Sequence, residues 1–204
     1  MDHLLPVGRT LEQFQGFDYV EMNPRIHAAY QIEEVDRERQ RLQMSTEAKP
    51  DGAESRFTLK KLFSFKRNSI SVRYELETPT DLEEKPVFAS EINLSLPEPP
   101  GERVRVFAMV RGERKPLIEE KVSLRQISEL IIEDSVNKAC LTLSGSKRFR
   151  LWMFPVSTEY ATESGQIREY QSTCIVAGWP KTGGNYKNWD ATLTLKAEKL
   201  TKSR

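Results

Sequence analysis

Apolar and polar residues alternate along most of the chain after Arg56, with the period of a β-strand that buries one face. The clearest run is 70–76, where every second residue is apolar: Ile70, Val72, Tyr74 and Leu76. The segment 88–96 has an apolar face with Phe88, Ile92, Leu94 and Leu96, and a mixed face with Ala89, Glu91, Asn93 and Ser95. Both segments therefore predict strands with one side against a core.

Further segments share this strand character: 103–110, 138–144, 148–156, 171–179 and 191–200. The intervals are rich in Gly, Pro, Asn and Ser, which predicts turns at 66–69, 97–102, 134–138 and 144–147, and a longer loop at 180–188. Short strands joined by turns predict an all-β fold, namely an antiparallel β-sandwich with little helix.

Other parts of the chain have a less regular pattern. The stretch "TLEQFQGF" predicts a short helix or turn capped by Thr10. Residues 25–45 fit either a charged helix or a long edge strand, and 47–55 predict a polar loop. In 123–135 the apolar spacing is ambiguous, and we expect a short turn followed by a strand from about Glu129.

The composition narrows the class of protein. The chain has 204 residues, 38% of them hydrophobic, which suffices for one sizeable domain. Its formal net charge of +1 argues against nucleic-acid binding by bulk electrostatics. It contains no apolar run long enough for a membrane helix and no signal-peptide pattern. We expect a cytoplasmic protein in which Cys140 and Cys174 are reduced thiols on strands.

The chain offers little for nucleophilic or metal chemistry. His3 and His27 are its two histidines, and no G-x-S-x-G elbow accompanies them. The histidines and cysteines are too widely spaced to predict a metal site. We therefore assign no catalytic residue, metal or cofactor, and expect the histidines to be a terminal residue and a packing residue.

Carbohydrate chemistry remains open. Glycosidases need two carboxyl groups across a glycosidic bond, and Glu91 and Glu163 are the first acids to test, although a surface ion pair or a turn hydrogen bond would explain each. Aromatic residues gather in the last third: Trp152 and Trp179 fit a core, while Tyr186 and Trp189 fit an exposed loop. The candidate carbohydrate-binding residues are Glu91, Asn93, Trp152, Glu163, Gln171, Tyr186 and Trp189.

Three stretches in order support a family resemblance. Residues 1–31 have an acid-His-apolar start and a T-L-E-x-F segment; 57–78 precede the strand at 88–96; and 151–180 carry F-P, Glu163, Gly165, Y-Q and Trp179 in turn. Together they resemble the carboxy-terminal β-sandwich domain of family 57 glycoside hydrolases, the α-amylase and 4-α-glucanotransferase group. The resemblance implies a large β-sandwich of the galactose mutarotase-like or supersandwich type.

In that family the nucleophile and the acid/base belong to a preceding (β/α) barrel, for which this chain has no room. The resemblance thus implies that 1–204 is a single noncatalytic accessory domain, cut from or related to a longer glycan-processing enzyme. Glu163 would then be a structural or ligand-contacting residue at a sheet corner. The expected partners are an α-glucan or oligosaccharide and a separate catalytic barrel, with no nucleic acid or membrane.

Two other hypotheses stay open at this point. One is an interdomain docking module that binds no sugar and uses an exposed apolar surface. The other is a carbohydrate-active enzyme in its own right, with Glu91 and Glu163 as acid and base.

Overall fold

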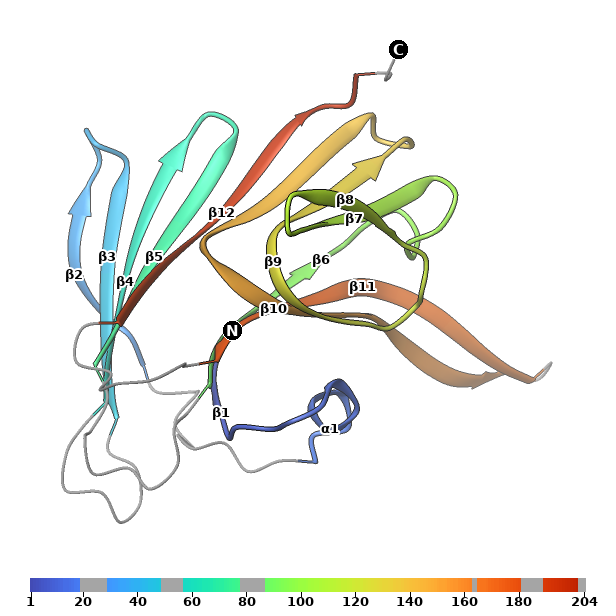
Figure 1. The fold of residues 1–204 in the computed structure, drawn as a ribbon, viewed down its shortest axis with the longest axis horizontal. Helices are drawn as coiled ribbons and strands as arrows, with labels where there is room; N and C mark the ends of the chain where they lie inside the picture. The colour runs from blue at the N-terminus through green and yellow to red at the C-terminus, as the bar shows by residue number, and fades with distance from the viewer. Residues whose placement is uncertain (19–28, 49–56, 78–86, 163–164, 181–188, 202–204) are drawn as a thin grey trace.

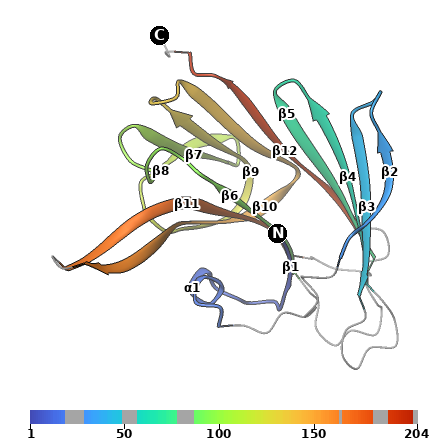
Figure 2. The same cartoon turned by 180° about the vertical axis from the view of Figure 1, so that it is seen from behind.

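The computed structural model describes residues 1–18, 29–48, 57–77, 87–162, 165–180 and 189–201. Most of them lie in strands that run antiparallel to their neighbours, as Figures 1 and 2 show from opposite sides. The elements are β1 (Asp2–Leu5), α1 (Leu11–Gln15), β2 (Gln31–Asp36), β3 (Arg41–Ala48), β4 (Phe57–Lys66), β5 (Ser69–Glu77), β6 (Val87–Leu94), β7 (Val104–Val110), β8 (Glu113–Leu117), β9 (Val122–Asp134), β10 (Ala139–Thr162), β11 (Gly165–Pro180) and β12 (Trp189–Lys199). The prediction of an all-β antiparallel fold with little helix is confirmed.

The sheet splits along β10, which pairs with β9, β11 and β12. Residues 139–145 pair with β12, whereas residues 150–162 pair with β11. On the β12 side the sheet continues through β5, β4, β3 and β2, which we call the large layer; on the β11 side it continues through β6 and β1, the small layer. The two layers diverge from β10, and β9, β7 and β8 extend the sheet on its other side (Figure 1).

The main core lies where the two layers face each other. It takes Tyr74 and Leu76 from the large layer, Phe88 and Trp179 from the small layer, and Leu151 from β10. The rings of Tyr74, Phe88, Phe149, Trp179 and Trp189 pack against one another with centroids 5.0–6.3 Å apart. The alternation predicted for 70–76 is confirmed, and burial increases along β5 from an exposed Ile70 to a fully buried Leu76.

A second cluster covers the opposite face of the small layer. Leu11 and Phe14 of helix α1 pack in one cluster with Trp152, Phe154 and Val176. Thr10 caps this helix as predicted, in a capping box with Gln13. The small layer is therefore buried on both faces, which explains why its strand β11 carries an unbroken apolar run.

The structure resolves the ambiguous segments. Residues 31–48 form the hairpin β2–β3 at the edge of the sheet, so the edge-strand alternative is correct for this part. The expected strand start near Glu129 is wrong, because β9 begins at Val122. A positive φ of 62° at Gln126 and a shift of register bend the strand there, which breaks the apolar alternation. Cys140 and Cys174 are free and lie on strands, as expected.

The predicted turn at 144–147 is also wrong: these residues lie inside β10, at the split of the sheet. Gly145 has no room for a side chain, since a Cβ would lie 2.7 Å from the Lys147 carbonyl oxygen and 2.9 Å from the Phe149 ring. Nearby backbone groups find other partners: Trp179 Nε1 donates to Lys147 O (3.3 Å), and Ser146 Oγ accepts from Thr192 N (2.8 Å). The small residues therefore serve a bulge instead of a turn.

We predict that Gly145→Ala lowers the free energy of unfolding by about 1–3 kcal/mol, because the new methyl group overlaps backbone and ring atoms. Chemical denaturation measures this change. Gly101→Ala is the control, since its Cβ would meet only Pro99 O, at 3.7 Å. Equal stability of the two variants would show that the split tolerates a side chain.

Candidate functional site

Glu91 and Asn93 lie side by side on the outer face of the small layer, as the alternation of 88–96 predicts. Asn93 Nδ2 donates to Glu91 Oε1 (2.6 Å), and His3 Nε2 lies 2.9 Å from Glu91 Oε2. The hydrogen bond from His3 is the main reason that the pKa of Glu91 lies below its ordinary value, although burial opposes this shift. Glu91 is thus an ionised acceptor held by two protein donors.

His3 connects this carboxylate to the second cluster. It lies in β1 with 4% of its surface exposed, and its ring meets the Phe14 ring edge-on at 5.1 Å. Cys174 lies on the same face, and burial, with a smaller contribution from Glu91, raises the pKa of its thiol to about 12. The group is therefore a buried polar network with no activated nucleophile.

Trp152 and Gln171 occupy two different environments. Trp152 is buried, 5.4 Å from the Phe14 ring and 5.8 Å from the Arg150 guanidinium carbon. Gln171 is exposed. It lies at a bulge: Ser157 pairs with Tyr170 and Val156 pairs with Ser172, so Gln171 is the extra residue between them. Beyond this bulge β10 and β11 form a projecting two-stranded arm (Figure 1).

Trp189 lines a hollow of about 250 Å³ at the ends of β5 and β12. Asp190 and Glu75 border it with Arg73, whose guanidinium lies 3.2 Å from Glu75 Oε1 and 4.0 Å from Asp190 Oδ2. Lys147 Nζ is 5.5 Å from the centre of the Trp189 ring. This hollow combines an aromatic wall with charged hydrogen-bonding groups.

The structure does not gather the predicted carbohydrate-binding residues into one site. Glu91, Asn93 and Trp152 share the outer face of the small layer, whereas Trp189 lies at the end of the large layer. Glu163, Tyr186 and His27 lie outside the described residues. The carbohydrate-binding role of the set stays a prediction.

The sequence patterns did not predict an apolar surface on the large layer. It continues the core-facing side of β12 outward over β5, β4, β3 and β2, since residues opposite each other in neighbouring strands point to the same face. We call it the wing face; it consists of Ile32, Val35, Leu42, Met44, Phe63, Phe65, Ile70 and Val72. Four of its side chains are 40–63% exposed: Ile32, Val35, Phe65 and Ile70.

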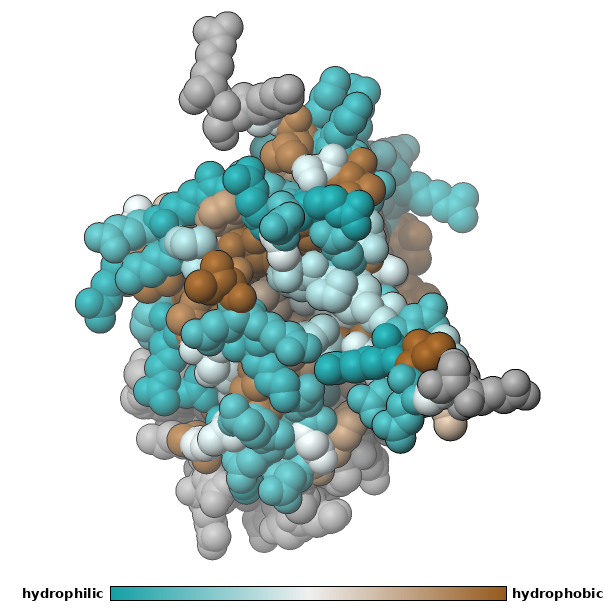
Figure 3. All heavy atoms as spheres, turned by 90° about the vertical axis from the view of Figure 1, so that its right-hand side faces the viewer, coloured by the Kyte–Doolittle hydropathy of each residue, from teal (hydrophilic) through white to brown (hydrophobic). Residues whose placement is uncertain are grey.

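Other surfaces are more polar. Figure 3 views the side that carries the arm: hydrophilic residues predominate, and apolar patches are small, one of them beside the tip of the arm. Tyr160 and Ile167, a cross-strand pair on the arm, are 43% and 42% exposed. Over the described ranges, no group of three or more His, Cys, Asp or Glu is placed to hold a metal ion. No helix among the described residues could cross a membrane.

Residues 1–193 match the family model described as "Alpha-amylase/4-alpha-glucanotransferase, C-terminal". The chain belongs to this family. The resemblance noted in the sequence is therefore confirmed, and the accessory position that it implied agrees with the description of the family as C-terminal. No curated protein matches the chain.

Solved structures similar to this α-amylase/4-α-glucanotransferase C-terminal domain share its fold. The 4-α-glucanotransferase from Thermococcus litoralis has a TM-score of 0.68 at 17% identity over 96% of this chain and 26% of that chain. A galactose mutarotase related enzyme from Lactobacillus acidophilus has a TM-score of 0.54 at 9% identity over 86% of this chain and 73% of its own. A galactose mutarotase-like protein from Clostridium acetobutylicum has a TM-score of 0.53 at 10% identity, over 83% and 66%.

These likenesses confirm the galactose mutarotase-like fold class. The chain spans about a quarter of the length of the glucanotransferase that it resembles. Arg9, Arg73 and Arg150, which border the hollows of this domain, carried no signal in the sequence, because their neighbours come from distant strands.

We predict that Glu91→Gln destabilises the domain by about 1–2 kcal/mol at pH 7, because His3 loses a charged acceptor. Since the pKa of Glu91 is lowered by folding, its contribution is present above the unfolded-state pKa and is lost as the pH falls through the folded-state pKa. The difference between wild type and variant should thus shrink below about pH 4.

Chemical denaturation between pH 3 and 7 measures this, with Glu75→Gln, which alters an exposed acid of β5, as the control. A destabilisation that is constant across the pH range would mean that ionisation of Glu91 does not contribute to the stability of the folded domain.

Proposed function

We propose that the chain is a noncatalytic accessory domain of an α-glucan-processing glycoside hydrolase or glucanotransferase, and that it docks onto a catalytic barrel domain through the wing face. The observation that carries the proposal is the contrast between the two faces of the outer strands of the large layer, which we call the wing. One side holds exposed apolar residues such as Val35 and Phe65, while Ser64, Ser71 and Thr194 occupy the other.

Such a contrast is typical of a sheet that has a partner on one side. If both faces of these strands were in contact with water, polar residues would be expected on both of them outside the core. Apolar side chains that share one exposed face gain stability when a partner removes them from water.

Two observations support a catalytic domain as the partner. The family consists of C-terminal domains of α-amylases and 4-α-glucanotransferases, and most of the Thermococcus litoralis 4-α-glucanotransferase chain lies outside the part that this domain matches. On this proposal the bond-breaking groups belong to the partner, and both act in the cytoplasm.

We predict that the chain binds the family's catalytic domain from the same organism with micromolar or tighter affinity, and that Ile70→Glu raises the Kd at least tenfold, or about 1.4 kcal/mol. Burying an unpaired carboxylate in an apolar contact is unfavourable. Isothermal titration calorimetry with the two separately produced domains measures the Kd.

Ser64→Glu adds the same charge on the opposite side of the wing and should leave the affinity unchanged. Both variants should unfold within about 1 kcal/mol of the wild type, since neither position lies in the core. Binding that survives Ile70→Glu, or fails equally with Ser64→Glu, would exclude the wing face as the interface.

A second candidate function is contact with α-glucan at the Trp189 hollow. Ligand sites combine apolar walls with a few polar groups, and here Trp189 and Leu76 are joined by Arg73, Glu75 and Asp190. Its volume of about 250 Å³ lies just below the usual range for ligand pockets, about 300–1,000 Å³. The hollow therefore suits a single sugar ring.

We predict that maltotriose shifts the indole N–H signal of Trp189 in NMR spectra with a Kd of about 1 mM, a binding free energy of about −4 kcal/mol. The signals of the buried Trp152 and Trp179 should stay fixed. Asp190→Ala should weaken binding several-fold, because it removes a hydrogen-bond acceptor from the hollow.

Glu198→Ala, an exposed acid on the same strand, is the control. Unchanged spectra at 20 mM maltotriose would exclude this second function and leave docking alone. Cleavage or glucosyl transfer by the purified chain would contradict the noncatalytic proposal itself.

A further inference from the structure

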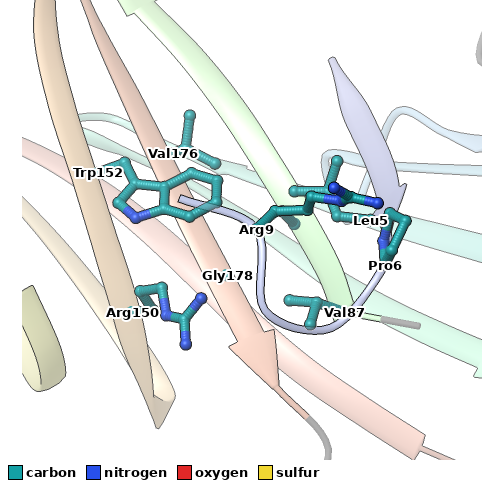
Figure 4. Close-up of a pocket in the computed structure, with 9 residues that line it drawn as sticks. Leu5, Pro6, Arg9, Val87, Arg150, Trp152, Val176 and Gly178 are labelled. Atoms are coloured by element: carbon teal, nitrogen blue, oxygen red, sulfur yellow. The ribbon is translucent and has the colours of Figure 1, made fainter. Parts of the chain in front are cut away.

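A small pocket lies at the outer face of the small layer, where the segment between β1 and α1 crosses the strands. Figure 4 shows Arg9 and Arg150 bordering it from different parts of the chain, with Trp152 and Val176 on its strand side and Gly178 between the arginines. Apart from the two arginines, the described residues that line it are apolar. This two-arginine pocket is separate from both the wing face and the Trp189 hollow.

The two guanidinium groups are the unusual feature of the pocket. The Nε atoms of Arg9 and Arg150 are both buried and have no hydrogen-bond partner. Buried donors without a partner are rare in folded proteins, and water, an ion or a ligand commonly explains them. Burial, with a smaller contribution from Arg125, lowers the pKa of Arg150, as expected for a buried cation.

None of the described residues that line the pocket is acidic, so this part of its lining contains two cations and no carboxylate. A guanidinium presents N–H donors in a planar fork that matches the oxygens of a carboxylate or a phosphate. The apolar walls strengthen this attraction because they exclude water from it. The charge and the donors of the pocket therefore both select a negatively charged oxygen group.

The size of the pocket limits what can enter. Its free volume is about 10 Å³, close to the room that one water molecule needs. A sugar ring does not fit, but one oxygen of a compact anion does. We propose that the two-arginine pocket binds an oxyanion, the phosphate or carboxylate group of a small ligand.

Gly178 provides a way to fill the pocket without removing charge. A Cβ built on it would lie 3.7 Å from Val87, 3.8 Å from Ala89 and 4.0 Å from Arg150, which are ordinary contact distances. Alanine is therefore tolerated at this position, and its methyl group takes up space at the floor of the pocket. Gly178→Ala thus tests the cavity, and Arg150→Gln tests the charge.

The experiment follows the arginine Nε–H signals of the ¹⁵N-labelled full chain by NMR. Sodium phosphate and sodium acetate are added separately, with sodium chloride keeping the ionic strength constant. We expect the Nε–H signals of Arg9 and Arg150 to shift together and to saturate. The thermal midpoint should rise by about 3 °C at a tenfold excess of the anion over Kd. A response to phosphate alone or to acetate alone would identify the preferred oxyanion.

Arg150→Gln and Gly178→Ala should each weaken anion binding at least tenfold. If both variants lose affinity, a folding defect in one of them cannot explain the result. Arg148→Gln, which changes an exposed arginine on the same strand, should leave binding unchanged. The proposal is overturned if neither anion gives a saturating shift at 50 mM, or if Arg148→Gln weakens binding as much as Arg150→Gln, which would indicate general surface attraction.

Discussion

The packing of this domain depends on the split of one sheet along β10. The strand leaves β12 after Gly145 and joins β11 from Arg150, so the two layers separate at a fixed place and enclose the aromatic core. The turn in direction needs a residue without a side chain, because the Lys147 carbonyl and the Phe149 ring occupy the space where a Cβ would stand. Hydrophobic burial on both sides of the split then holds the layers together.

The layers differ in what they leave uncovered. The small layer has the core on one face and α1 with its cluster on the other, so its polar groups Glu91 and His3 are enclosed and paired. The large layer extends past the core, and the same apolar alternation that builds the core continues onto a free surface. For this reason the proposed docking role rests on the large layer, and the proposed anion site rests on a narrow pocket of the small layer.

The sequence predicted strands best where one face meets the core. Residues 70–76 alternate cleanly for this reason, whereas 88–96 belong to the layer that is buried on both faces. The family resemblance placed both segments in the correct fold class. The turn predicted at 144–147 was wrong because Ser and Gly occur in turns and in bulges alike, so the sequence does not distinguish the two. The sites were hardly predictable: Glu91 meets His3 from 88 positions away, and Arg9 and Arg150 line one pocket only once the chain has folded. In β2, Ile32 and Val35 are separated by two acidic residues, so the sequence shows no regular apolar alternation there that would have predicted the wing face.

Those acidic residues have a further consequence for the free edge of the sheet. An edge strand beside an uncovered apolar surface is a template for fibril growth, because another strand can add to its open backbone groups. In β2, Glu33, Glu34 and Asp36 place like charges along that edge, and the shift of register between Ile32 and Glu34 interrupts its regular spacing. These charges and this irregular register disfavour the pairing of a second chain along β2.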